Sequence, residues 1–202
     1  MIKFIKQNFN LILASQSQIR KKILQEAGFQ FSVVKPDFDE DKEKQLVSLE
    51  PKDLALYLAK NKALSISKNN PNHYVIGSDQ VCEFLGKEVF KSINLQDAIT
   101  QLSSFNGSTH YQNNAIIIAK NNKVLFTNSA RAKLTMRNLS KNEIKSYVEF
   151  DQSWGCAGSY KYESMGKHLF LDVEGDYFGI LGLPIQPILK FFYREGLLEF
   201  KN

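Results

Sequence analysis

The sequence predicts a mixed α/β fold, because short apolar runs typical of buried strands alternate with amphipathic stretches typical of helices. Strand and helix patterns alternate early in the chain, hairpin patterns occupy its middle, and a helix pattern comes last. Of the 202 residues, 43% are hydrophobic and 23% are charged, which are ordinary values for a globular protein. The sequence has no repeat, low-complexity linker or clean boundary, so we expect one domain over residues 1–202.

The first part of the chain contains two strand patterns and two helix patterns. LILA at 11–14 predicts a central strand, and the helix pattern that follows it ends at Gly28. FSVV at 31–34 predicts a second strand, and the polar segment 36–44 is expected to be a loop. A long helix is expected to open at Ser48 and Pro51. Its apolar face consists of Leu54, Ala55, Leu58, Ala59, Ala63 and Ile66.

A strand or hairpin is expected in the next segment. YVIG at 74–77 has the composition of a buried strand, and the run after Asp79 continues to a turn at Gly86. Asn94 is a suitable N-cap for another helix, which Gly107 is expected to stop. Asp79 is therefore expected at the end of an apolar strand.

The last part of the chain predicts a hairpin and two helices. Asn121-Asn122 separates two strand patterns, the second of which continues through 130–136. Ser140 and Glu143 form a capping box for a helix that runs to about Phe150. The segment 168–184 has the pattern of a strand, a turn and a further strand or loop, and 185–195 predicts a terminal amphipathic helix.

The net charge of the chain is +5, because it contains 26 Lys and Arg residues and 21 Asp and Glu residues. This excess either reflects AT-rich codons, which favour Lys, Asn and Ile, or indicates a polyanionic ligand such as a nucleotide or nucleic acid. The basic residues are scattered and form no stripe interleaved with aromatic residues. The charge alone does not choose between these ligands.

Several protein classes are excluded by what the sequence lacks. No apolar run approaches the ~20 residues that cross a bilayer, and residues 1–10 make a poor signal peptide, so no membrane partner and a cytoplasmic location are expected. Cys82 and Cys156 are the only cysteines, and neither they nor the three histidines have metal-ligand spacing. The GxxxxGK[ST], GxGxxG and GxSxG motifs are absent.

Polar residues at the ends of apolar elements are the candidates for chemistry. Ser15 and Ser17 lie where a strand pattern gives way to a helix pattern, and Arg20 follows one turn later. Hydroxyls, backbone N–H groups and the helix dipole can bind a phosphate at such a turn. On these residues alone, a simple N-cap at Ser17 and a solvated Arg20 are the plainer interpretation.

Acidic residues and lysines elsewhere in the chain have both a functional and a structural interpretation. The acidic residues of 37–41, which are Asp37, Asp39, Glu40 and Asp41, form either a solvated loop or part of a Mg²⁺ site completed by substrate phosphates. Lys62 interrupts an apolar helix face and either extends to solvent or points to a phosphate. Lys91 is either a surface lysine or a third cation of the site.

Asp79 is the strongest candidate for a functional residue. A buried carboxylate is costly unless backbone N–H groups, a cation or a bound water pair with it. Beside polar Ser78 and Gln80, the carboxylate is expected to face a cleft, where it would act as a metal ligand or general base.

Taken together, these segments resemble the Maf family of nucleoside triphosphate pyrophosphatases along nearly the whole chain. The matching segments, in order, are LILASQSQIR with the later Asp39-Glu40, LAKNKA at 58–63, VIGSDQVC at 75–82, SFNGSTH at 104–110, SWGCAGSYKYESMG at 153–166 and EGDYFGILGLP at 174–184. Each segment alone is weakly specific, but six in the right order make a specific pattern.

The resemblance implies hydrolysis of a nucleoside triphosphate to the monophosphate and pyrophosphate, with a divalent cation such as Mg²⁺ or Mn²⁺. It implies an elongated mixed sheet flanked by helices, with a cleft between two lobes, as in inosine-triphosphate pyrophosphatases. Asp79 would be the general base and a metal ligand, and Glu40 its acidic partner. The phosphate-binding groups would be Arg20, Lys62 and Lys91, with Ser15 and Ser17 at the strand-to-helix turn.

The resemblance also suggests a substrate and an assembly. Gln80 and the segment that contains Glu163 are similar to the branch that acts on 7-methylguanosine triphosphate. Glu163 could accept hydrogen bonds from a guanine edge, so both residues are expected to bind substrate. The family further suggests a homodimer, with neither nucleic acid nor membrane as a partner.

A hypothesis from another class is a basic regulatory protein that binds nucleic acid or a cell-division partner without catalysis. Its binding would depend on salt and on lysines, and Asp79→Asn would have no effect. A nucleotide sensor, which binds a triphosphate without cleaving it, is intermediate between the two hypotheses.

Overall fold

The computed structural model describes residues 4–201, apart from the side chains of Asp41 and Gln45. The first three residues of the 1–10 segment and the Asp41 side chain therefore lie outside the description. Among the described helices, none combines the length and the apolar character needed to cross a bilayer.

A mixed sheet forms the centre of the described chain. Its strands run in the order β3-β2-β4-β6-β7-β8, and β5 pairs with β4 outside this path. The strands are β2 (Asn10–Leu13), β3 (Ser32–Val33), β4 (His73–Phe84), β5 (Lys87–Val89), β6 (Thr109–Lys120), β7 (Lys123–Met136) and β8 (Phe170–Glu174). β2 is parallel to β3 and β4, whereas the remaining pairs are antiparallel. The mixed α/β class predicted from the sequence is therefore confirmed.

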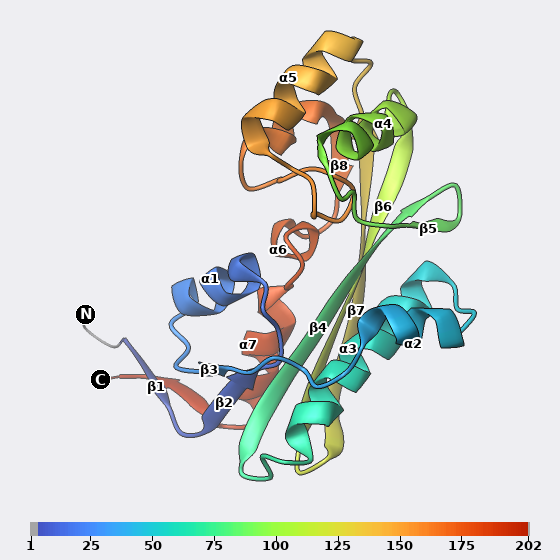
Figure 1. The fold of residues 1–202 in the computed structure, drawn as a ribbon. Helices are drawn as coiled ribbons and strands as arrows, with labels where there is room; N and C mark the ends of the chain where they lie inside the picture. Colours follow the sequence, from blue (N-terminus) through green and yellow to red (C-terminus); the bar gives the residue numbers. More distant parts are fainter. Residues whose placement is uncertain (1–3, 202) are drawn as a thin grey trace.

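The helices cover both faces and the far end of this elongated sheet (Figure 1). They are α1 (Gln18–Glu26), α2 (Glu40–Leu46), α3 (Pro51–Ser67), α4 (Leu95–Phe105), α5 (Lys141–Asp151), α6 (Tyr177–Ile180) and α7 (Ile185–Arg194), with a 3₁₀ helix over Met165–Leu169. A short ribbon of β1 (Ile5–Gln7) and β9 (Leu198–Phe200) joins the two ends of the chain.

Successive side chains of β4 and β6 point to opposite faces of the sheet, so the core is divided into layers. Ile76, Ile116 and Ile118 pack in the cluster that contains the apolar residues of α1 and α7. Ala115 and Ile117 point to the other face, where they pack against α3. A third cluster joins α4, α5 and β8 at the far end of the sheet. Asp79 lies on the α3 side of β4, because it is two residues from both Gly77, which contacts α3, and Val81.

The position of Asp79 within β4 corrects the prediction that it ends a strand. β4 is one continuous strand, and Asp79 lies in its middle, opposite Ala115 of β6. The other edge of β4 pairs with β2 at 73–76 and with β5 at 82–84. Of the described strands, none pairs with this edge over 77–81. The sheet is therefore open on that side, and Asp79 lies in the opening.

The polar segment 36–44 was expected to be a loop, and this prediction holds for 36–39 but is wrong from Glu40 onward, where α2 begins. Asp39 caps α2 by accepting a hydrogen bond from the N–H of Lys42 at 3.2 Å, and Lys44 pairs with Glu40 one turn apart at 3.5 Å. Capping and an i,i+4 ion pair stabilise a helix without any apolar run. The helix fixes the direction of the Glu40 side chain.

Other boundaries differ in smaller ways. The strand expected at 31–34 is only β3, and α3 begins after Glu50 without a cap from Ser48. The second half of 168–184 contains α6, capped by Asp176, where a strand or loop was expected. β1 and β9 were not predicted. The remaining helices and hairpins are confirmed, including the capping box of α5 and the Asn121-Asn122 turn.

Candidate active site

A cavity of about 500 Å³ lies at the opening beside β4. Its walls come from the turn between β2 and α1, from α2, from the β4–β5 hairpin, and from residues 155–163. The residues that the family resemblance assigns to the site all line it: Ser15, Ser17, Arg20, Glu40, Lys62, Asp79, Gln80, Lys91 and Glu163. Of the acidic residues offered as part of a Mg²⁺ site, Asp37 and Asp39 do not line the cavity. The fold thus brings together residues that are up to 148 positions apart in the sequence (163 − 15).

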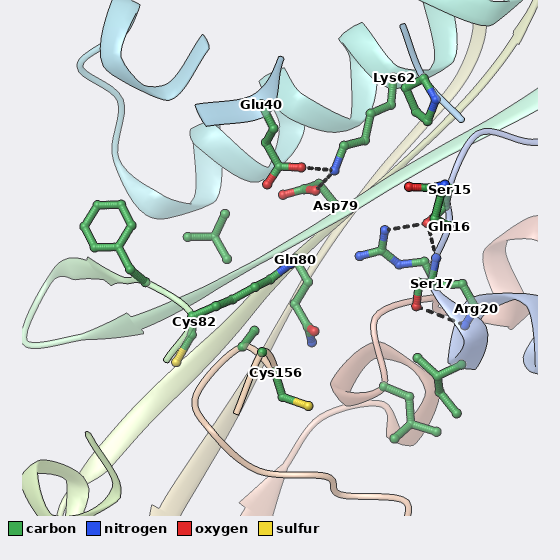
Figure 2. Close-up of a pocket in the computed structure, with 18 of the residues that line it drawn as sticks. Ser15, Gln16, Ser17, Arg20, Glu40, Lys62, Asp79, Gln80, Cys82 and Cys156 are labelled. Atoms are coloured by element: carbon green, nitrogen blue, oxygen red, sulfur yellow. Dashed lines mark hydrogen bonds and ion pairs between the residues drawn. The ribbon is translucent and has the colours of Figure 1, made fainter. Parts of the chain in front are cut away.

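Two carboxylates and a lysine form the centre of the cavity wall (Figure 2). Lys62 Nζ, from α3, donates to Asp79 Oδ1 and lies 2.7 Å from Glu40 Oε2, on α2. Asp79 is 4% exposed and Lys62 is 9% exposed, so these charges have little access to bulk water. Removing Lys62 would leave two uncompensated carboxylates, which is strongly destabilising, whereas removing either acid leaves Lys62 paired with the other one.

Glu40 is held in its ionised form by the surrounding lysines. Burial alone raises the pKa of Glu40, but the charges of Lys62, Lys44 and Lys91 outweigh burial and lower its pKa to about 2. At neutral pH the carboxylate is therefore fully charged. An acid of this kind is suited to holding a cation.

Lys44 and Glu88 extend the charge cluster, and sequence reasoning missed both. Lys44 Nζ lies 2.7 Å from Glu88 Oε1 on β5 and 3.5 Å from Glu40 Oε1. The two side chains line the cavity and tie α2 to β5. The Lys44–Glu40 ion pair could have been found from the sequence, because residues four apart lie on the same side of a helix. It was missed because the segment was expected to be a loop.

Arg20 lies on the opposite wall of the cavity, where its guanidinium contacts the protein itself (Figure 2). Nη1 donates to the main-chain oxygen of Ser78 at 2.6 Å and to Ser15 Oγ at 3.3 Å, and Nε donates to the main-chain oxygen of Gly182 at 2.9 Å. Ser17 caps α1 by accepting from the N–H of Arg20. The predicted phosphate ligand is thus also a clamp between α1, β4 and the 182–184 turn.

Gln80 has a similar structural contact. Its Nε2 donates to the main-chain oxygens of Gly179 and Ile180, at 3.2 and 2.8 Å, so this amide anchors α6 to β4. Lys91 and Glu163 are exposed at the rim of the cavity, where their charged ends are accessible. The binding roles of these three residues remain predictions.

The 155–160 segment of the cavity wall is held from behind by residues that were not selected from the sequence. Gln112 Nε2 donates to Ala157 O at 3.1 Å and to the Tyr160 hydroxyl at 2.8 Å, and His110 Nε2 lies 3.0 Å from the same hydroxyl. Ser92, next to Lys91, hydrogen bonds to Ser159 at 2.7 Å. These buried polar contacts fix the loop relative to β6.

The donor set is compatible with one kind of metal site. Among the described residues, no group of three or more His, Cys, Asp or Glu side chains is placed to hold an ion by itself. Asp79 and Glu40, however, both contact one ammonium group, so their oxygens are close enough to share a cation. Mg²⁺ is commonly bound by one or two carboxylates plus substrate phosphates, which these residues fit.

The fold and site together define a mixed α/β protein with an open-edged sheet and a cleft in which paired carboxylates and lysines can receive a polyanion with its cation. The chain belongs to the Maf family, because the family model for Maf-like protein matches residues 10–195. This finding confirms the family resemblance of the sequence segments.

Two relatives align with almost the whole chain. A protein of Bradyrhizobium diazoefficiens called nucleoside triphosphate pyrophosphatase is 39% identical over 192 residues, which are 93% of this chain and 95% of the relative. A protein of the same name from Legionella pneumophila strain Corby is 38% identical over 94% of this chain and 95% of its own. Among solved structures, a HAM1 protein from Coxiella burnetii is similar over 65% of this chain and 74% of its own, with a TM-score of 0.41 and 12% identity.

Proposed function

We propose that this protein is a nucleoside triphosphate pyrophosphatase, which hydrolyses its substrate to the nucleoside monophosphate and pyrophosphate. The observation that carries the proposal is the pairing of Asp79 and Glu40 around Lys62, in the cleft where the edge of β4 is open. Membership of the Maf family and the names of relatives that are 38–39% identical support the same activity.

In the proposed reaction, one water is added across the bond between the α and β phosphoryl groups. Asp79 accepts a proton from the attacking water, and the pyrophosphate leaves with the electron pair of the broken P–O bond. Lys62 and Lys91 stabilise the charge on the phosphoryl oxygens, and the Ser15 hydroxyl in the turn between β2 and α1 helps to position them. Most of the catalysis comes from positioning and charge stabilisation, so no covalent intermediate is needed.

Asp79 and Glu40 would hold a divalent cation, Mg²⁺ or Mn²⁺, together with oxygens of the substrate. When bound, such a cation polarises the phosphoryl oxygens and neutralises part of their charge. The lysines complement it, because a triphosphate carries more negative charge than one dication can balance.

Within this activity, we propose a modified purine nucleotide such as 7-methylguanosine triphosphate as the preferred substrate. Glu163 supports this proposal, because it lines the same cavity and is exposed there. A carboxylate can accept hydrogen bonds from the N–H groups of a guanine edge and favours the positive charge of a methylated ring.

The test is a panel of ordinary and modified triphosphates, incubated with Mg²⁺, with Mn²⁺ or with a chelator. Chromatography of the nucleotide and a pyrophosphate assay identify the bond that breaks. We expect equal amounts of monophosphate and pyrophosphate, formed only with a divalent cation. Release of orthophosphate with nucleoside diphosphate would contradict the activity, and faster cleavage of pyrimidine triphosphates would contradict the purine preference alone.

A further inference from the structure

Lys62 is paired with two carboxylates, which binding a phosphate does not by itself require. It projects from α3, whose other buried residues are mostly apolar, and its Nζ contacts two carboxylates from two different elements. Two of the three N–H donors of the ammonium group are thereby directed at acids. In this arrangement, the single positive charge of Lys62 is shared by Asp79 and Glu40 before any ligand takes part.

Lys62 lies between the two carboxylates that would hold a divalent cation. Lys62 lies against Asp79 Oδ1 and Glu40 Oε2, and Lys44 lies 3.5 Å from the second oxygen of Glu40. An ammonium and a dication bound to the same oxygens would repel each other strongly, because the site is largely buried and screening by water is weak. A cation on these oxygens therefore requires Lys62 to move.

A triphosphate provides the place for Lys62 to move to. Its phosphoryl oxygens are strong acceptors for an ammonium group, and Lys62 lines the same cavity that would receive them. The lysine then exchanges two carboxylate partners for phosphate partners, and the cation takes its place.

We propose that Lys62 is an internal counterion that holds the position of the divalent cation between Asp79 and Glu40, and that it passes to the phosphate oxygens when the cation arrives with the nucleotide. The inference rests on the proposed function. It has a consequence for the order of binding, because the free protein binds divalent ions weakly and the cation enters together with the triphosphate.

The experiment measures the binding of Mn²⁺ alone, without nucleotide, by electron paramagnetic resonance of the free ion. The proteins are the wild type, Lys62→Met and Lys91→Met. Lys91→Met removes the same charge from the rim of the cavity, so it is the matched control for a general electrostatic effect. We expect Lys62→Met to bind Mn²⁺ at least about tenfold more tightly than both other proteins, which corresponds to about 1.4 kcal/mol.

Two further measurements test where the ion binds and whether the nucleotide promotes its binding. The gain should disappear in the double variant Lys62→Met/Asp79→Asn, which places the ion at the carboxylates. If circular dichroism shows that Lys62→Met is unfolded, Lys62→Gln replaces it. In the wild type, a hydrolysis-resistant α,β-methylene triphosphate should tighten Mn²⁺ binding by at least about tenfold, beyond the Mn²⁺ that the same analogue binds without protein.

The inference is overturned if Lys62→Met binds Mn²⁺ no more tightly than Lys91→Met, or if the analogue leaves the affinity of the wild type for Mn²⁺ unchanged. Pyrophosphate release by the wild type is measured separately. If the wild type cleaves triphosphates but the expected differences in Mn²⁺ affinity are absent, the counterion inference fails and the proposed function stands. If these differences are present without cleavage, the counterion inference stands and the proposed function fails.

Discussion

Arg20 donates a hydrogen bond from Nη1 to the main-chain oxygen of Ser78, the residue before Asp79, over a distance of 2.6 Å. This oxygen lies on the edge of β4 between its pairings with β2 and β5. The guanidinium also donates to Gly182 O and Ser15 Oγ. Arg20 therefore satisfies a backbone group at the open edge of the sheet, and it holds three segments around the carboxylate.

The first prediction concerns this clamp. Arg20→Lys should lower the free energy of unfolding by about 1–3 kcal/mol, because an ammonium cannot reproduce the planar fork of hydrogen bonds. It should also lower kcat for pyrophosphate release, with a smaller effect on KM. Urea denaturation and steady-state kinetics measure these quantities. Arg194→Lys on the exposed end of α7 is the control, since its side chain is 63% exposed. A higher KM with unchanged stability would instead indicate that Arg20 acts only as a phosphate ligand.

Gly77 sets the distance between α3 and β4, and therefore the distance between Lys62 and Asp79. A Cβ at this position would lie 2.3 Å from the main-chain oxygen of Ala59 and 2.7 Å from the main-chain nitrogen of Ala63. We expect Gly77→Ala to destabilise the protein by about 3 kcal/mol, because backbone cannot yield as a flexible side chain does. Pyrophosphate release by the folded fraction should also fall.

A compensating variant checks this explanation. Ala63→Gly removes the Ala63 Cβ, which would lie 2.8 Å from the new Cβ, but it leaves the closer Ala59 oxygen in place. The double variant Gly77→Ala/Ala63→Gly should therefore recover little stability in thermal unfolding. Full recovery would show that the obstacle is the side chain of Ala63 and not the helix backbone.

His110 gives the stability a pH dependence. It is fully buried, stacks on Phe105 and lies beside the Tyr160 hydroxyl, and burial lowers its pKa to about 4. The unfolded chain binds a proton below about pH 6.5, whereas the folded protein resists it down to about pH 4. The contribution of His110 is thus fully present above pH 6.5 and is lost as the pH falls toward 4.

When the pH is lowered from 7 to 5, the free energy of unfolding of the wild type should fall by about 2 kcal/mol because of His110. His110→Gln should remove this part of the pH dependence, as measured by urea denaturation at both pH values. His168→Gln, at an exposed position, should leave it unchanged. An equal loss of stability in the wild type and in His110→Gln would disprove the assignment.

The proposed preference for a guanine-type base predicts a change in selectivity at Glu163. Glu163→Gln should lower kcat/KM for 7-methylguanosine triphosphate by about tenfold, because a charged acceptor for the base is lost. The value for uridine triphosphate should change little, since an amide can still pair with a pyrimidine. Glu149→Gln, on the exposed face of α5, is the control. An equal decrease in kcat/KM for both nucleotides would mean that Glu163 does not discriminate between the bases.

Asp79 could be selected from the sequence itself because it interrupts an apolar pattern, whereas the site roles of the other residues were implied by the resemblance to the Maf family. Lys62 in an apolar helix face and Asp79 in an apolar strand are costly unless they are paired, and the structure pairs them with each other. Glu40 could be selected, but its direction could not, because α2 depends on the Asp39 cap and an ion pair and has no apolar periodicity.

Other features depend on contacts that are distant in the sequence. Nothing local to Arg20 indicates that its guanidinium meets Gly182, 162 residues later. The same holds for Gln112, which supports a loop 45 to 48 residues further along the chain. The continuous β4 was missed because polar residues at 78–80 look like a strand end, although β6 pairs with them throughout.

The most direct test of the account is pyrophosphate release by Asp79→Asn, measured beside Glu83→Gln. Both residues are acids of β4, but Glu83 pairs with Arg131 and Asn113, whereas Asp79 lines the cavity. Asp79→Asn should lose activity by about 10²–10⁴-fold while circular dichroism shows an intact fold, and Glu83→Gln should remain active. Retention of wild-type pyrophosphate release in Asp79→Asn would contradict the central claim that this carboxylate carries the chemistry.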